Sequence, residues 1–196
     1  IEGHQLYSGM TLTGKICASF FSAVTPRTAG FNTTDIGGLS DAGKLLSIIL
    51  MFIGGGSGST AGGVKVGTVF VLVLYLRSTL LRSPGTNIFG RRIESDTITK
   101  ASAVFCTNLF FSLIGTLLLC VTQHFDLADA MLEVVSAIST VGMTAGLTTK
   151  LNTLSKLVII GLMYLGRVGS LSFALSFTDH KKIAHVMQPV EPINIG

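Results

Sequence analysis

An internal repeat at an offset of 112 residues constrains this chain more than any other feature. Thr28-Ala29-Gly30-Phe31-Asn32, the first strip, recurs as Thr140-Val141-Gly142-Met143-Thr144, the second strip, and each follows a short apolar segment. The offset extends further along the chain, where Leu39, Lys44, Leu45, Ile48, Leu50, Met51 and Gly54 recur as Leu151, Lys156, Leu157, Ile160, Leu162, Met163 and Gly166. One structural unit is therefore present twice.

The composition indicates a protein of the lipid bilayer. Hydrophobic residues make up 48% of the chain, charged residues make up 12%, and the mean hydropathy is +0.65, which is too apolar for an ordinary soluble domain. Residues 101–121 and 157–177 are apolar except for Arg167, and each is long enough to cross a hydrocarbon core of ~30 Å. The apolar stretch at 45–76 is interrupted by residues 54–63, the glycine-rich loop. We expect two spanning helices and one discontinuous helix.

The positive charges indicate topology rather than nucleic-acid binding. The net charge is +4, but the basic residues are scattered at the ends of apolar segments without interleaved aromatic residues. Five of them lie between the broken helix and the next span, and two follow the last span: Arg77, Arg82, Arg91, Arg92 and Lys100, then Lys181 and Lys182. The positive-inside rule makes 77–96 a cytoplasmic linker and 179–196 a cytoplasmic tail of a multi-pass protein in the cell membrane.

The repeat predicts an all-α membrane protein built from units of membrane helix, re-entrant pore loop and membrane helix. Residues 97–178 form a complete unit, with an outer helix at 97–122, a short helix at 127–139, the second strip, and an inner helix at 154–177. Asp126 and Asp129 suit the positive end of that short helix and can cap its unpaired amides.

The first copy of the unit, residues 1–76, has a short helix at 12–24, the first strip, and a broken inner helix beginning near Ala42, but no outer helix. We expect two further pore units outside these residues, in a longer polypeptide or a split assembly. Cys17, Cys106 and Cys120 show no metal or redox spacing and are predicted to be buried apolar residues.

The two strips have the chemistry of an ion filter. A partly dehydrated alkali cation needs several oxygen dipoles around it, which backbone carbonyls can supply in an extended segment. Gly30 and Gly142 permit the required backbone angles, and Thr28 and Thr140 add a hydroxyl group. The alternative is that Thr-x-Gly is a common loop tripeptide, but its repetition at a fixed offset favours a filter. The predicted filter residues are Thr28, Ala29, Gly30, Phe31, Asn32, Thr140, Val141, Gly142, Met143 and Thr144.

The glycine-rich loop is predicted to be a gate. It superficially fits nucleotide-binding patterns, but no βαβ arrangement surrounds it and Lys65 is not next to the required glycine. Close helix packing is the plainer alternative, although ten almost uninterrupted small residues exceed that need. We expect a mobile intramembrane loop, anchored by Lys65 through a carbonyl or carboxylate. The predicted gate residues are Gly54, Gly55, Gly56, Ser57, Gly58, Ser59, Thr60, Ala61, Gly62, Gly63, Lys65 and Arg167.

Two charged residues lie inside the predicted membrane segments. Arg167 costs about 2.5 to 3.5 kcal/mol near mid-membrane unless it is hydrated or paired, so we expect it to face the pore cavity or a partner. It has two candidate roles, a structural ion pair and an electrostatic barrier to cation leak. Glu133 lies on the second short helix, where it either supports the filter or contacts the ion.

These residues resemble the Ktr/Trk/HKT superfamily of potassium transporters. The resemblance rests on residues 22–33 (SAVTPRTAGFNT), the glycine-rich loop, 139–148 (STVGMTAGLT) and 166–169 (GRVG), and it is greatest to the third and fourth pore units of a KtrB-type membrane subunit. It implies a four-unit pore in one chain, a homodimer, and a cytoplasmic nucleotide-binding ring that regulates it. It also implies that the glycine-rich loop moves aside to admit an ion and that Glu133 supports the filter from behind. Phe31-Asn32 and Met143-Thr144 depart from the Tyr-Gly end of potassium-channel filters, so weaker discrimination against sodium is expected.

The sequence thus predicts gated potassium uptake, with K⁺ as the transported ion, Na⁺ as a second candidate, and no covalently bound cofactor. No catalytic constellation or His/Cys metal pattern is present, so we do not expect an enzyme. Nucleotide would act only through the regulatory partner. The alternative function is that of a non-conducting structural or assembly subunit of the membrane complex. A membrane-embedded enzyme using the glycine-rich loop for phosphate ranks last.

Overall fold

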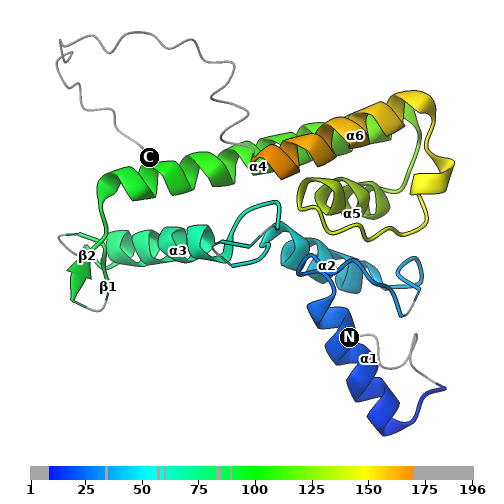
Figure 1. Ribbon diagram of the computed structural model, residues 1–196, viewed down its shortest axis with the longest axis horizontal. Coiled ribbons are helices and arrows are strands. Elements are labelled where there is room, and N and C mark those ends of the chain that lie inside the picture. The colour runs from blue at the N-terminus through cyan, green and yellow to red at the C-terminus, as the bar shows by residue number, and fades with distance from the viewer. Residues whose placement is uncertain are drawn as a thin grey trace.

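The fold is described from a computed structural model that covers residues 9–33, 35–56, 58–59, 61–82, 85–88 and 90–169. The predicted all-α class is confirmed, because almost all regular structure in these residues is helical (Figure 1). The α-helices are α1 (Leu12–Val24), α2 (Asp41–Phe52), α3 (Val66–Leu80), α4 (Ser95–Thr122), α5 (Leu127–Ile138) and α6 (Thr153–Val168). A 3-10 turn, η1 (Thr148–Lys150), and two short strands, β1 (Asn87–Ile88) and β2 (Arg91–Arg92), complete the list.

The sequence repeat is also a structural repeat. The short helices α1 and α5 have 13 and 12 residues, so each is about 20 Å long and too short to cross a bilayer. The helices that follow the strips, α2 and α6, begin at equivalent caps. Ser40 Oγ accepts from the Gly43 amide at 3.2 Å, and Asn152 Oδ1 accepts from the Ser155 amide at 2.7 Å. Both copies therefore start their inner helix with the same local interaction.

Helix α4 has the dimensions of a membrane span. Its 28 residues correspond to about 42 Å, and its mean hydropathy over the best window is 2.2. Among the described residues it is the one helix that meets the length and hydropathy of a span, while α1 and α3 are shorter apolar helices. The predicted inner helix at 154–177 is shorter in the structure, where α6 ends at Val168 and Gly169 follows with a φ of 95°; residues 170–177 lie outside the described residues.

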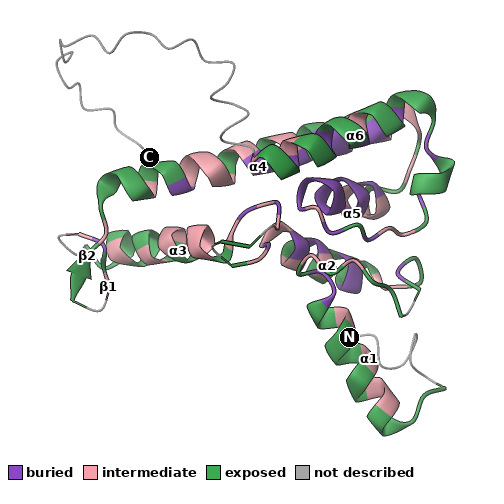
Figure 2. Cartoon of the chain, viewed as in Figure 1, coloured by how far each residue is buried: buried purple, intermediate pink, exposed green. Residues whose placement is uncertain are grey.

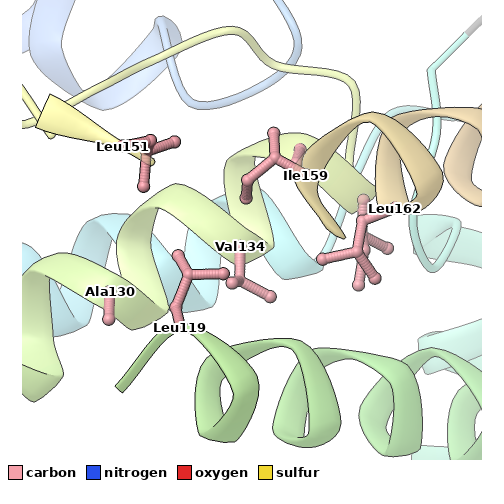
Figure 3. Packing of buried hydrophobic residues seen from close by; sticks show 8 residues of the cluster. Leu119, Ala130, Val134, Leu151, Ile159 and Leu162 are labelled. Atoms are coloured by element: carbon pink, nitrogen blue, oxygen red, sulfur yellow. The ribbon is translucent and has the colours of Figure 1, made fainter. Parts of the chain in front are cut away.

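The core forms around α5, which packs against α2, α4 and α6 (Figure 1). One apolar cluster joins three helices, with Leu119 from α4, Val134 from α5 and Leu162 from α6 among its members (Figure 3). Eight residues of α5 are buried, whereas α1 has no buried residue (Figure 2). The two short helices thus share a sequence pattern but differ in how many neighbours cover them.

The glycine-rich loop divides the first inner helix into α2 and α3, as predicted, and its two ends are bonded together. The Gly54 amide donates to the Val64 carbonyl at 2.8 Å, the Val64 amide donates to the Phe52 carbonyl at 3.3 Å, and the Val66 amide donates to the Gly55 carbonyl at 3.2 Å. Val64 is completely buried. This closed neck satisfies the backbone groups that the helix break would otherwise leave unpaired.

The connection between α3 and α4 differs from the predicted linker at 77–96. Helix α3 continues to Leu80 and α4 begins at Ser95, so the helices include both ends of that range. Between them lies a small antiparallel hairpin that pairs Asn87 with Arg92. Two residues per strand give no alternating pattern long enough for the sequence to predict this hairpin.

Two smaller predictions are wrong. Asp126 occupies the N-cap of α5, but its side chain makes no capping hydrogen bond. Cys17 and Cys106 are exposed rather than buried, and Cys120 is only half-buried. Cys17 lies on α1, which has no buried residue among those described, and Cys106 lies on an exposed part of α4.

We predict that Gly166→Ala destabilises the protein by about 1–3 kcal/mol, the usual range for an overfilled contact. A Cβ at this position would overlap the main-chain carbonyl of Ile138, at the end of α5. Thermal unfolding of the complete polypeptide in detergent measures the effect. Gly161→Ala is the matched control, since it lies on the same helix with nothing within 4 Å of an added Cβ. Equal unfolding temperatures for the two variants would contradict the close approach.

Candidate functional site

The two strips, separated by 112 residues in the sequence, touch each other. A Cβ added to Gly30 would overlap the carbonyl oxygen of Val141 and would lie 3.8 Å from the Cα of Gly142. The closest approach is therefore between main-chain atoms at the centre of each strip. Only glycine at position 30 leaves room for the Val141 carbonyl to point at the opposite strip.

Backbone conformation repeats from one strip to the other. Thr28 and Gly30 have φ values of 67° and 73°, and Thr140 and Gly142 have φ values of 55° and 84°. Positive φ is a strained state for a β-branched residue such as threonine. Alternation of positive and negative φ turns successive N–H groups to one side of a chain and the carbonyls to the other. The same strained alternation in both copies indicates that carbonyl orientation is the shared requirement.

Amide groups of the strips bond back to the ends of the short helices. The Val141 amide donates to the Ser136 carbonyl at 3.0 Å, and the Thr140 amide donates to the Ala137 carbonyl at 3.2 Å. In the first strip the Ala29 and Gly30 amides donate to the Thr25 carbonyl at 3.2 and 3.4 Å. Both helices thus end directly at a strip, where the negative end of the helix dipole favours a cation.

A small, partly open cavity of about 40 Å³ lies beside the strips, roughly the space of one or two water molecules. Phe31 and Asn32 from the first strip and Met143 from the second contribute to its lining. Phe31 and Asn32 are exposed, whereas Met143 is buried. The two copies therefore present different side chains where the sequence departs from the Tyr-Gly end of a channel filter.

The glycine-rich loop contacts the start of the second strip. The Gly62 amide donates to Thr140 Oγ1 at 2.9 Å. A Cβ on Gly62 would lie 2.8 Å from the Ile138 carbonyl oxygen, and one on Gly63 would lie 2.8 Å from Ser139 Oγ. The loop therefore fits against the strip only because these two residues have no side chain.

Lys65 holds the loop from the other side. Its Nζ donates to the Ser59 carbonyl at 2.7 Å and to the Ala61 carbonyl at 3.3 Å. Of the two partners that the sequence left open, a carbonyl or a carboxylate, the structure contains the carbonyls. Of the predicted gate residues, Ser57 and Thr60 lie outside the described residues.

Glu133 is buried in α5 and braces the segment that follows the second strip. Its Oε1 accepts a hydrogen bond from Thr148 Oγ1, and Thr148 Oγ1 in turn accepts from the Thr144 hydroxyl at 3.0 Å. The Gly146 amide donates to the same Thr144 oxygen at 3.0 Å. Glu133 Oε2 is buried and has no hydrogen-bond partner among the described residues. A carboxylate in α5 is thus connected through one hydroxyl group to the last residue of the strip.

Arg167 lies in the last turn of α6, and its side chain is exposed. The preceding residue, Gly166, packs against the Ile138 carbonyl, which Gly62 of the loop also approaches. The arginine therefore follows directly after the point where α6 and the loop meet the end of α5.

Sequence reasoning missed three features of this site. Thr148 carried no signal, because a threonine in a connecting turn is ordinary. Ser139, completely buried beside Gly63, was assigned only to the end of a helix. The ion pair between Lys44 Nζ and Asp129 Oδ1 at 2.7 Å could have been found, since a lysine within an apolar helix requires a partner.

Comparison with known proteins gives consistent matches. Residues 2–185 match the TrkH family, described as a cation transport protein. The chain is 42% identical to Ktr system potassium uptake protein B of Bacillus subtilis over 166 residues, which are 85% of this chain and 37% of that protein. It is 38% identical to the potassium/sodium uptake protein NtpJ of Enterococcus hirae over 201 residues, covering 100% of this chain and 44% of that protein.

The fold is similar to the crystal structure of the potassium transporter TrkH from Vibrio parahaemolyticus. The TM-score is 0.74 at 21% identity, over 90% of this chain and 40% of that one. This likeness supports the fold of membrane helices and pore loops. The chain spans about two fifths of the length of the curated relatives named above.

We predict that Thr148→Val lowers the unfolding temperature of the complete polypeptide, because Glu133 Oε1 loses its donor. Leaving a buried acceptor unpaired costs about 1–3 kcal/mol. Thr148→Ser keeps the hydroxyl group and serves as the control, which should unfold near the unmodified temperature. If valine and serine behave alike, the hydroxyl bridge from Glu133 does not stabilise the strip.

Proposed function

Since the chain belongs to the TrkH family of cation transport proteins, we propose that it forms part of a gated pore for potassium uptake across the cell membrane. Membership in a transporter family places the chain in the membrane. The names of the relatives support potassium as the ion, and that of NtpJ adds sodium as a second candidate. They do not favour the alternative of a non-conducting assembly subunit.

The contact between Gly30 and the Val141 carbonyl is the observation that carries this proposal. Two strips with matching positive φ values meet through main-chain atoms, and two amides of each strip are occupied by bonds to the ends of the short helices. Carbonyl oxygens remain to replace the water shell of a passing cation. The residues of both strips, 28–32 and 140–144, are the proposed filter, with Glu133 as its support.

The glycine-rich loop is the proposed gate. It is bonded to Thr140 of the second strip through the Gly62 amide and to Lys65 through two carbonyls. A conducting state would require release of these few bonds, whereas the neck at Gly54 and Val64 can remain closed. Arg167, next to the same junction, supplies positive charge that opposes cation leak.

The membrane potential supplies the driving force in this proposal, at about 2.3 kcal/mol per 100 mV for each monovalent cation. Two pore units cannot enclose an axis by themselves, so the complete pore includes two further units. A homodimer and a cytoplasmic nucleotide-binding ring complete the proposed complex, with residues 77–96 and the C-terminal tail on the cytoplasmic side.

Gly30→Ala in the complete polypeptide should reduce potassium uptake about tenfold or more. The new Cβ would overlap the Val141 carbonyl, and the left-handed backbone adds about 1–2 kcal/mol of strain for an alanine. Uptake is measured as potassium flux, and as growth on low potassium, in cells that lack their own uptake systems. Gly161→Ala is the control for expression and insertion. Normal uptake by Gly30→Ala would exclude the strips as the filter.

Gly62→Ala should instead raise the potassium flux, up to about tenfold, because a Cβ in the contact with Ile138 and Thr140 displaces the loop at a cost of about 1–3 kcal/mol. Gly56→Ala is the matched control in the same loop, since nothing lies within 4 Å of an added Cβ there. The flux of both variants is compared per inserted protein. A Gly62→Ala flux no higher than that of Gly56→Ala would rule out the loop as the gate.

A further inference from the structure

Three identical residues are buried in one copy of the repeat and exposed in the other. Lys44, Ile48 and Met51 lie on one face of α2 and are 8%, 4% and 0% exposed. Their equivalents on α6 are Lys156, Ile160 and Met163. Lys156 is exposed, and Ile160 and Met163 are 59% and 46% exposed. Spacings of three and four residues place each set on a single helix face. Among the described residues, this surface is therefore covered in one unit and exposed in the other.

The partner of the α2 face is the short helix of the next unit. Asp129, in the first turn of α5, pairs with Lys44 at 2.7 Å. Leu132 and Val135, three and six residues further along α5, belong to the same buried cluster as Ile48 and Met51. This interface thus joins one carboxylate to one lysine beside an aliphatic contact, and it links one pore unit to the following one.

We propose that the Lys156, Ile160 and Met163 face of α6 docks against the short pore helix of a further pore unit. That helix carries Asp or Glu in its first turn, at the position equivalent to Asp129, and aliphatic residues three and six positions later. The inference rests on the proposed function, since it requires units beyond the two in this chain. It adds the face, the ion pair and the sequence pattern that its partner must have.

Charge complementarity favours such a pore helix over a second copy of α1 as the partner of the α6 face. The first turn of α1 contains no acidic residue, and the residues at the positions of Asp129, Leu132 and Val135 are Cys17, Phe20 and Ala23. An α1 helix would therefore leave Lys156 without a carboxylate. Lipid alone suits Ile160 and Met163, but its acyl chains do not supply the carboxylate with which Asp129 pairs the equivalent Lys44.

Site-specific photocrosslinking in the complete polypeptide tests the interface. A diazirine-bearing aliphatic amino acid replaces Met163, and the membranes are irradiated before adducts are mapped by mass spectrometry. We expect adducts on a pore helix outside residues 1–196, with Asp or Glu in its first turn. The same probe at Met51 is the positive control and should label α5. The probe at Leu157 is the negative control, because Leu157 and its equivalent Leu45 are both exposed.

Charge exchange provides a second measurement. Lys156→Glu should lower the adduct yield at position 163 about tenfold or more, since it places two carboxylates together. Replacement of the partner carboxylate by lysine in the same protein should restore the yield. Lys44→Glu combined with Asp129→Lys is the matched charge exchange at the interface between α2 and α5.

The outcomes divide clearly. Three results at position 163 would overturn the interface: adducts with lipid, adducts with α1 of a second copy, or no polypeptide adduct at all while the Met51 probe labels α5. Potassium uptake measured on the same unsubstituted polypeptide separates this result from the proposed function. Uptake with no pore-helix adduct rejects the interface alone, and an adduct without uptake rejects the function alone.

Discussion

Hydrogen bonding of the strip amides to the ends of α1 and α5 is the interaction on which the rest of the structure depends. Within a bilayer an irregular backbone is tolerated only if its polar groups find partners, and the short helices supply carbonyl acceptors at Thr25, Ser136 and Ala137. In the proposed filter, the strip carbonyls are then left for a cation. Burial of α5 by α2, α4 and α6 keeps this arrangement in place, because a short helix cannot be held by its own hydrogen bonds alone.

The repeat separates what a sequence encodes from what its surroundings add. Local features agree in both copies: the short helices have 13 and 12 residues, the inner helices begin at the caps Ser40 and Asn152, and the strips have matching positive φ values. Burial differs, because α2, α4 and α6 pack against α5, whereas α1 has no buried residue among those that the structure describes. An exposed apolar face in this chain is therefore best understood by comparison with its repeat equivalent rather than by its exposure alone.

The sequence predicted the local elements well. The bounds of α1, the break in the inner helix and the return of the chain at both strips follow from apolar length, glycine content and the fixed offset. Contacts between residues far apart in the sequence were harder to predict. Nothing near Thr148 indicates that its hydroxyl reaches Glu133, and the meeting of Gly62, Gly166 and Ile138 depends on how three elements pack. The side chain of Asp126 occupies a cap position without capping, since Asp129 of the same turn is the carboxylate that finds a lysine.

The way in which the loop is held has a consequence for how this protein can diverge. The bonds that tie it to Lys65 and Thr140 use main-chain atoms of the loop, namely the Ser59 and Ala61 carbonyls and the Gly62 amide. Natural variation can therefore exchange Ser59 and Ala61 for other small residues without losing these bonds. A chimera that receives this loop would need Lys65 and Thr140 from the same donor, because the side chains of these two residues make the hydrogen bonds that hold the loop.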